Sequence, residues 1–214
     1  MRVVPRAEID RLAPGLNHQG VVALTGPFRY TPLPELLLSA PKPAVVFLDA
    51  VMDPHNLGSL LRSADGAGFA GVVVAARRAA GVTAAVRRVS AGASEFVPVA
   101  RVTNLGRALD DARRAGLWTV GLDQDAAEDL WTSHLMEPPV GLVLGSEDRG
   151  ISPAVRRHCD AFVSIPHRGA LDSLNVATAG AVAMFEVARR RLSVGSRGQP
   201  GDASSGSTLD GTLE

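Results

Sequence analysis

Short, continuous apolar runs alternate with helical patterns along most of this chain. The apolar runs cover residues 44–49, 71–76, 96–100, 117–122, 140–145 and 161–165. Apolar residues recur at helical spacing over 56–67, 83–91, 104–115, 152–158 and 174–191. Thr103 is placed to cap the third of these helices. Because the runs are continuous, each strand must be covered on both faces, which is typical of a mainly parallel sheet flanked by helices. The pattern therefore predicts an α/β fold.

The two ends of the chain lack this pattern. Residues 1–43 carry repeated prolines and one short candidate helix at 6–12, so we interpret them as an N-terminal extension or linker. Residues 193–214 are rich in glycine and serine, and we expect them to be disordered. One main domain over 44–192 is predicted, since a chain of 214 residues with 46% hydrophobic content can bury one sizeable core.

Composition narrows the class of protein. The formal net charge is +0, which argues against a protein that holds nucleic acid by bulk electrostatics. Eight arginines nevertheless lie between Arg77 and Arg114, and they fit either solvated helix faces or an RNA-facing patch. A single cysteine, Cys159, excludes an intramolecular disulfide and fits a reducing compartment. No apolar run reaches the roughly 20 residues of a membrane helix, so we expect a cytoplasmic protein without a membrane partner.

Three stretches combine a strand end, a polar loop and a helix: 47–69 (FLDAVMDPHNLGSLLRSADGAGF), 141–152 (GLVLGSEDRGIS) and 165–191 (IPHRGALDSLNVATAGAVAMFEVARRR). In the first, Asn56 is placed to cap the helix that carries Arg62. Arg62 lies about one and two-thirds turns further on, so it can point back over the loop end of the sheet. Ligands bind beyond the carboxyl ends of parallel strands. The alternative is that Asn56 only caps the helix and that Arg62 is a solvated residue.

The second and third stretches add residues at the same end of the sheet. Gly145 allows another group to approach the backbone closely. Glu147 is a carboxylate near Arg62, although a Glu–Arg pair at such a position is as often merely structural. Ser173 either caps the last helix or takes part in chemistry.

The sequence favours a structural role over a functional one for several other candidate residues. The glycines of 66–71 match a dinucleotide-binding pattern, but they close a helix and precede a strand, the reverse of the order that pyrophosphate binding requires. The five histidines show no metal-ligand spacing, and we expect no metal. Trp118 and Trp131 could stack on bases, but Trp118 lies in an apolar run and is expected in the core.

The three stretches, in this order, resemble the SpoU/TrmH family of SPOUT-class RNA ribose methyltransferases, over about residues 15–191. The resemblance implies a deep C-terminal trefoil knot and S-adenosylmethionine as cofactor, with cofactor contacts at Gly145, Ile165 and Leu174. It also implies that Asn56 and Arg62 belong to the active site, with Arg62 as the main catalytic residue. The class builds its site at a subunit interface, so we expect a homodimer, with Met184, Phe185 and Ala188 of the last helix in the interface.

The reaction implied is methyl transfer to a ribose 2′-hydroxyl. We hypothesise that Arg62 grips the adjacent phosphate and orients the hydroxyl, since guanidinium is a poor base. Glu147 would orient Arg62, and Asn56, Ser173 and Asn175 would complete the hydrogen bonds. Residues 17–24 resemble the linker that follows a small RNA-binding domain in longer members, which favours a guanosine of large-subunit ribosomal RNA as target.

Several alternatives remain open from the sequence. The RNA could be transfer RNA or an antibiotic-resistance site in ribosomal RNA, while DNA is not expected. A non-catalytic RNA-binding factor on the same fold and a nucleotide-binding oxidoreductase are the other classes. The upstream RNA-binding domain has no counterpart here, which fits a truncated chain, a misassigned start or a protein that works without it.

Overall fold

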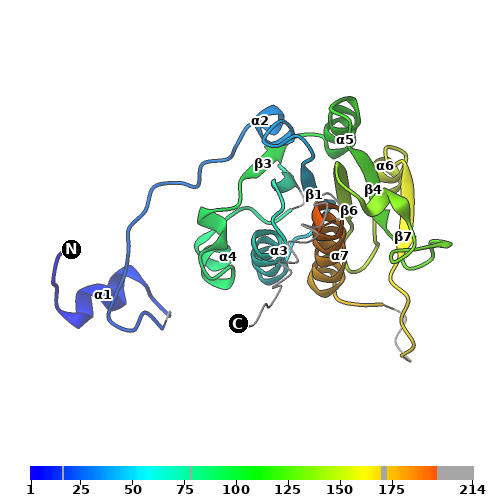
Figure 1. The fold of residues 1–214 in the computed structure, drawn as a ribbon. Coiled ribbons are helices and arrows are strands. Elements are labelled where there is room, and N and C mark those ends of the chain that lie inside the picture. Colours follow the sequence, from blue (N-terminus) through cyan, green and yellow to red (C-terminus); the bar gives the residue numbers. More distant parts are fainter. Residues whose placement is uncertain (16, 78, 170–172, 197–214) are drawn as a thin grey trace, which may run out of the picture.

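The computed structural model describes residues 1–15, 17–77, 79–169 and 173–196 (Figure 1). Within them, seven parallel strands form one sheet in the order β3-β2-β1-β6-β4-β7-β5. The strands are β1 (Ala44–Leu48), β2 (Gly71–Ala75), β3 (Val99–Val102), β4 (Trp118–Leu122), β5 (Glu128–Asp129), β6 (Val140–Leu144) and β7 (Ala161–Ser164). The predicted parallel α/β sheet is confirmed, with the edge strand β5 in addition.

Helices cover both faces of this sheet (Figure 1). They are α2 (Leu33–Leu37), α3 (Pro54–Gly66), α4 (Ala84–Val89), α5 (Leu105–Arg114), α6 (Pro153–Arg156) and α7 (Val176–Ser196), with short 3₁₀ helices η1 (Ala93–Glu95) and η2 (His134–Met136). Helix α1 (Arg6–Leu12) lies apart from the sheet and has no buried residue. Successive residues of β1 face opposite cores. Val46 packs in the core that includes α3, α4 and α7, and Val45 in the core that includes α2, α5 and α6. Both residues are fully buried, which explains why the run is continuous in sequence.

Helix α2 was not predicted, because residues 1–43 were interpreted as irregular. Its Leu36 and Leu37 are nevertheless buried beside β1 and β2. Leu36 packs so closely on Gly71 that a Cβ there would lie 2.5 Å from the leucine side chain. This segment therefore contributes core packing to the domain that follows it.

Three helix caps differ from the expected ones. The Asp53 side chain, rather than Asn56, caps α3 by accepting a hydrogen bond from the His55 amide. Asn104 caps α5, where Thr103 was expected to do so. Asn175, rather than Ser173, accepts hydrogen bonds from the first amides of α7. In each case the cap lies where the tertiary structure ends the preceding loop, one to three residues from the expected position.

Two expectations about single apolar residues are wrong. Trp118 begins β4 with 52% of its surface exposed, so it is not a core residue. Met184 is fully buried within its own chain, so it cannot face a partner, whereas Phe185 on the same helix is 52% exposed. The 66–71 glycines do end α3 and precede β2 as expected, with Gly68 at φ +65°.

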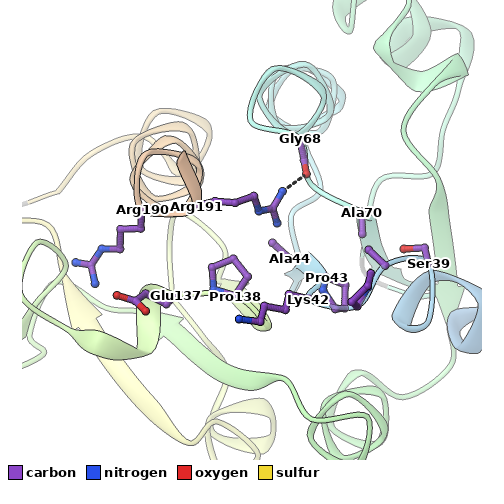
Figure 2. Close-up of a pocket in the computed structure, with 12 residues that line it drawn as sticks. Ser39, Lys42, Pro43, Ala44, Gly68, Ala70, Glu137, Pro138, Arg190 and Arg191 are labelled. Atoms are coloured by element: carbon purple, nitrogen blue, oxygen red, sulfur yellow. Dashed lines mark hydrogen bonds between the residues drawn. The ribbon is translucent and has the colours of Figure 1, made fainter. Parts of the chain in front are cut away.

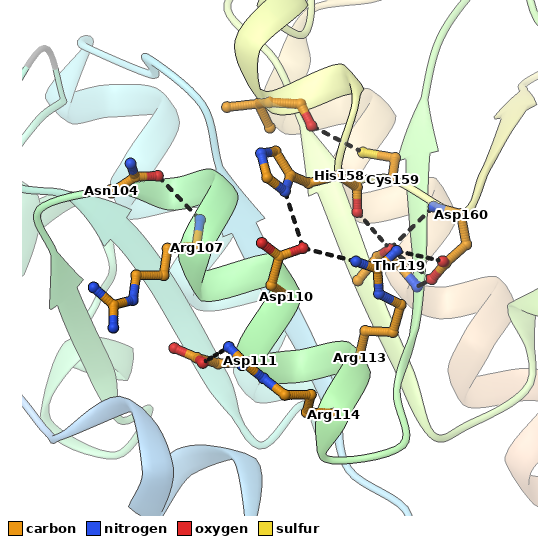
Figure 3. Close-up of polar contacts among 11 residues, drawn as sticks. Asn104, Arg107, Asp110, Asp111, Arg113, Arg114, Thr119, His158, Cys159 and Asp160 are labelled. Carbon is orange, nitrogen blue, oxygen red and sulfur yellow. Dashed lines mark hydrogen bonds and ion pairs between the residues drawn. The ribbon is translucent and has the colours of Figure 1, made fainter.

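Several arginines between Arg77 and Arg114 form intramolecular contacts. Arg113 and Arg114 form ion pairs with Asp110 and Asp111 on their own helix, α5 (Figure 3). Two further arginines pair with or stack on neighbours: Arg87 with Glu95 and Phe28, and Arg101 with Tyr30. Arg78 lies outside the described residues. Intramolecular contacts thus account for four of the eight arginines, three of them on helices.

No helix within the described residues is long and apolar enough to cross a membrane. Residues 197–214, most of the segment expected to be disordered, lie outside the part of the chain that the structure describes.

Candidate active site

The loops that follow β1 and β6 meet at the carboxyl edge of the sheet. Leu48 and Leu144, the last residues of these strands, are register partners, and the Asp49 amide donates to the Leu144 carbonyl at 2.8 Å. The Asp49 carboxylate then accepts a hydrogen bond from the Ser152 amide at 2.7 Å, which fastens the end of the 145–152 loop. Polar residues of the first two motifs therefore share one place, as predicted.

A chain of hydrogen bonds joins the three motifs. The Asn175 Nδ2 donates to Asn56 Oδ1 at 3.2 Å, and Asn56 Nδ2 donates to the Glu147 carboxylate. Glu147 lies 91 positions from Asn56 in the sequence, and Asn175 lies 119 positions from it. Asn56 is only 8% exposed, so both ends of its amide are held in fixed directions. The structure thus brings together three of the five predicted catalytic residues.

Arg62 is separate from this chain of hydrogen bonds. It is exposed on α3 and makes no hydrogen bond or ion pair within the described residues. The predicted pairing of Glu147 with Arg62 is not made within one chain among the described residues, where the bonded partner of Glu147 is Asn56. The guanidinium of Arg62 is left available to a group from outside the chain.

A cavity of about 590 Å³ lies beside the 145–151 loop, at the carboxyl ends of β4 and β6. Gly145, Ile165 and Leu174, the three predicted cofactor contacts, all line it, together with Glu147 and Ser173. Its volume fits a small-molecule ligand, and its lining is mostly polar with apolar side chains such as Ile165 and Leu174 among the polar ones. The residues present therefore fit a nucleoside-bearing cofactor.

The loop at Gly145 explains why glycine is needed there. A Cβ on Gly145 would lie 2.0 Å from the carbonyl carbon of Gly150, so only glycine lets the loop fold back on its own start. Ser146 and Gly150 exchange backbone hydrogen bonds at 3.1 and 2.9 Å across this turn. The close approach inferred from the sequence is thus made by the loop itself, which leaves its outer face toward the cavity.

Two residues of the cavity wall were missed by the sequence analysis. Asp123 follows β4, and Arg156 ends α6; both line the cavity and pair with each other. An aspartate directly after an apolar strand is a detectable signal, but its partner 33 residues later is not. Only the tertiary structure shows the pair.

A second cavity, of about 600 Å³, lies at the opposite, amino-terminal edge of the sheet. Figure 2 shows Lys42, Glu137, Arg190 and Arg191 around it. Arg190 is bonded to Glu186 and to three backbone carbonyls, and Arg191 donates to the Gly68 carbonyl. None of the predicted site residues lies there, so the first cavity is the candidate active site. No group of histidine, cysteine or acidic residues suited to a metal is found in the described part of the chain.

Comparison with known proteins shows the family of this chain. The model of the SpoU rRNA Methylase family matches residues 43–185. The chain belongs to this family. It is 41% identical over 196 residues to the 23S rRNA (guanosine-2'-O-)-methyltransferase RlmB of Haemophilus influenzae, covering 90% of this chain and 79% of that protein. RlmB of Escherichia coli is 39% identical over 194 residues, covering 89% of this chain and 79% of the relative.

Solved structures show the same fold. The SpoU methyltransferase AviRb from Streptomyces viridochromogenes, in complex with the cofactor AdoMet, has a TM-score of 0.64 and 37% identity over 70% of this chain. The AdoMet-bound rRNA methyltransferase from Sinorhizobium meliloti has a TM-score of 0.67 and 32% identity over 77% of this chain. This chain spans 58% and 62% of those two chains, less than two thirds of their length. The expected SpoU/TrmH-type methyltransferase with S-adenosylmethionine as cofactor is confirmed.

Proposed function

We propose that this protein transfers a methyl group from S-adenosylmethionine to the ribose 2′-hydroxyl of a guanosine in 23S ribosomal RNA. The observation that carries the proposal is the hydrogen-bonded chain from Asn175 through Asn56 to Glu147, beside a cavity that fits a nucleoside-bearing cofactor. The names of the RlmB relatives, at about 40% identity, support the choice of base and RNA.

The residues in the site suit a reaction that depends mainly on positioning. The cofactor supplies a methyl group that its positive sulfur has already activated. The hydroxyl oxygen must approach in line and lose its proton as the new bond forms. Arg62, which has no intramolecular partner among the described residues, would hold the neighbouring phosphate with its fork of donors. Asn56, Glu147, Ser173 and Asn175 would orient the ribose.

A homodimer would complete this site. Arg62 does not line the cavity of its own chain. It shares a face of α3 with Gly66, where a Cβ would lie 3.3 Å from the ring of Phe185 on α7. Phe185 and Leu192, seven positions apart on α7 and here called its apolar stripe, are 52% and 76% exposed, and Phe185 lies beside the position one helical turn after Arg62. An isologous contact through this stripe would bring Arg62 toward the partner's cavity.

The remaining expectations extend the same proposal. A trefoil knot is supported by the return of the third motif to the first through Asn175 and Asn56, and by the packing of α7 beside α3. A cytoplasmic location follows from ribosomal RNA as substrate. Residues 17–24 would act as a linker, and residues 44–192 as the methyltransferase domain.

The test is methyl transfer from isotopically labelled S-adenosylmethionine to unmodified 23S rRNA and transfer RNA transcripts. Nuclease digestion and mass spectrometry then identify the methylated nucleoside. We expect 2′-O-methylguanosine from 23S rRNA. Arg62→Ala should lower kcat by about 10²- to 10³-fold, the loss typical for one stabilising donor, with the Kd of the cofactor unchanged.

Arg114→Ala is the matched control, since Arg114 is an exposed arginine on α5 whose partner is a neighbouring aspartate. Full activity of Arg62→Ala would contradict the role of Arg62. The absence of both cofactor binding and methylated RNA would instead favour the non-catalytic RNA-binding factor.

A further inference from the structure

Asp123 shapes the turn that forms one wall of the cavity. Its Oδ1 accepts a hydrogen bond from the Asp125 amide at 3.0 Å, and its carbonyl accepts one from the Ala126 amide at 3.2 Å. Its other carboxylate oxygen pairs with Arg156. Burial raises the pKa of Asp123, but the hydrogen bonds from Arg156 and from the Asp125 amide outweigh burial, so the net pKa lies below its usual value. The carboxylate is therefore charged at neutral pH.

Arg156 is itself held in place on its other side. Its guanidinium carbon lies 4.0 Å above the centroid of the Phe162 ring, a short cation–π distance. Phe162 of β7 is the register partner of Gly121 of β4. A Cβ on Gly121 would lie 2.5 Å from the Phe162 ring, so glycine at this position makes room for the ring on which Arg156 stacks. The guanidinium of Arg156 is thus held by the Phe162 ring and by the Asp123 carboxylate.

The pair joins two separate walls of the same cavity. Asp123 belongs to the turn after β4, whereas Arg156 ends α6, which directly follows the 145–152 loop. We infer that Arg156, stacked on Phe162 and paired with Asp123, is a positioning residue that sets the spacing of these two walls and thereby the affinity for the methyl donor. Its effect is on cofactor binding, because neither residue is bonded to the Asn56, Glu147 and Asn175 chain.

The inference rests on the proposed function of this cavity. An ordinary surface ion pair contributes roughly 0–1 kcal/mol to stability and nothing to ligand affinity. The Arg156 side chain is 46% exposed and the Asp123 side chain is 17% exposed. An ordinary surface ion pair and a positioning pair therefore differ in the ligand affinity expected of the variants, and not in their expected stability. The experiment therefore measures cofactor affinity and turnover separately from the melting temperature.

The test uses the full chain with Arg156→Ala, Arg156→Lys, Asp123→Asn and the double variant. Calorimetry gives the Kd for S-adenosylmethionine and for S-adenosylhomocysteine. Methyl transfer to 23S rRNA gives kcat and the KM for S-adenosylmethionine. We expect Arg156→Ala to raise Kd and KM about 10-fold, within the range of coupled neighbours, with kcat within about 2-fold of the parent. Arg156→Lys should be intermediate because it keeps the charge but loses the flat stacking group. The double variant should lose no more than the stronger single variant.

Arg157→Ala is the matched control, since Arg157 is the adjacent, exposed arginine outside the cavity lining. An unchanged Kd in folded Arg156→Ala, or an equal loss in Arg157→Ala, would overturn the inference. A loss of affinity confined to S-adenosylmethionine would overturn it too. Misplacing a cavity wall must weaken the binding of both ligands equally, whereas a direct charge effect distinguishes the sulfonium from the neutral sulfur. Failure of the parent protein to bind either ligand would overturn the proposed function of the cavity, and the inference with it.

Discussion

At the residue scale, the amide of Asn56 organises the candidate site. An amide can donate and accept at the same time, and Asn56 does both: it donates to Glu147 and accepts from Asn175. An aspartate at this position would face the Glu147 carboxylate with a like charge and could not donate to it. Asn56 is not the cap of α3, because it lies inside the helix, which Asp53 caps.

Cys159 shows how burial controls a single group. Burial and the nearby charge of Asp160 raise the pKa of the Cys159 thiol to about 12. Only the thiolate reacts with alkylating reagents, so at pH 8 the folded protein should react with iodoacetamide orders of magnitude more slowly than the protein in urea. Mass spectrometry of timed samples measures both rates. Equal rates in the two states would show that the thiol is not buried in solution.

At the scale of elements, α7 is anchored by a buried charge network near its end. Glu186 is 4% exposed and pairs with Arg189 and Arg190. Arg190 continues the network by donating to the carbonyls of Leu130, Trp131 and Ser133. The helix that carries Asn175 at its start is thus fixed at its other end to the segment before β6.

Glu186→Gln should therefore destabilise the protein strongly. Removing the carboxylate leaves the buried Arg190 without its counter-charge, and breaking such a pair typically costs about 3–5 kcal/mol of unfolding free energy. Urea denaturation at pH 7 measures the loss. Arg189→Ala is the control, since this arginine is 63% exposed and should cost only about 0–1 kcal/mol.

The same network predicts a pH dependence. Hydrogen bonds from Arg189 and Arg190 hold the pKa of Glu186 below its usual value of 4.5. A carboxylate with a lowered pKa contributes stability above its unfolded pKa and loses it as the pH falls through its folded pKa. The stability difference between the parent and Glu186→Gln should therefore shrink below about pH 4. A difference that is constant from pH 7 to pH 3 would argue against an ionised Glu186.

At the scale of the whole molecule, the parallel sheet separates two kinds of surface. Its carboxyl edge carries the three motifs and the candidate site, while the cavity at its amino edge contains none of the predicted site residues. The exposed apolar stripe of α7 lies beside α3, so a contact between two chains there would be close to Arg62. Assembly and catalysis would then depend on the same face.

Phe185→Asp should test this dependence. If two chains meet through the stripe, a charge in its centre should convert a dimer to a monomer, because an unpaired buried carboxylate is costly. Light scattering coupled to size-exclusion chromatography measures the mass. Phe96→Asp is the control, since Phe96 is another exposed phenylalanine, 77% exposed, at the end of η1. A parent protein that is monomeric at micromolar concentration would contradict the homodimer.

The amino-acid sequence by itself determined the parallel α/β class and the identity of the three motifs, since buried strands must be continuous apolar runs and loops after them must carry the polar groups. Tertiary structure decided which groups touch. It placed Glu147 on Asn56 rather than on Arg62, exposed Trp118, buried Met184 and Leu36, and paired Asp123 with Arg156. These contacts join residues far apart in sequence, and local patterns carry information only about neighbours along the chain. Gly58 shows the same limit, because it is needed only where α4 packs so closely that a Cβ would lie 2.7 Å from Val89.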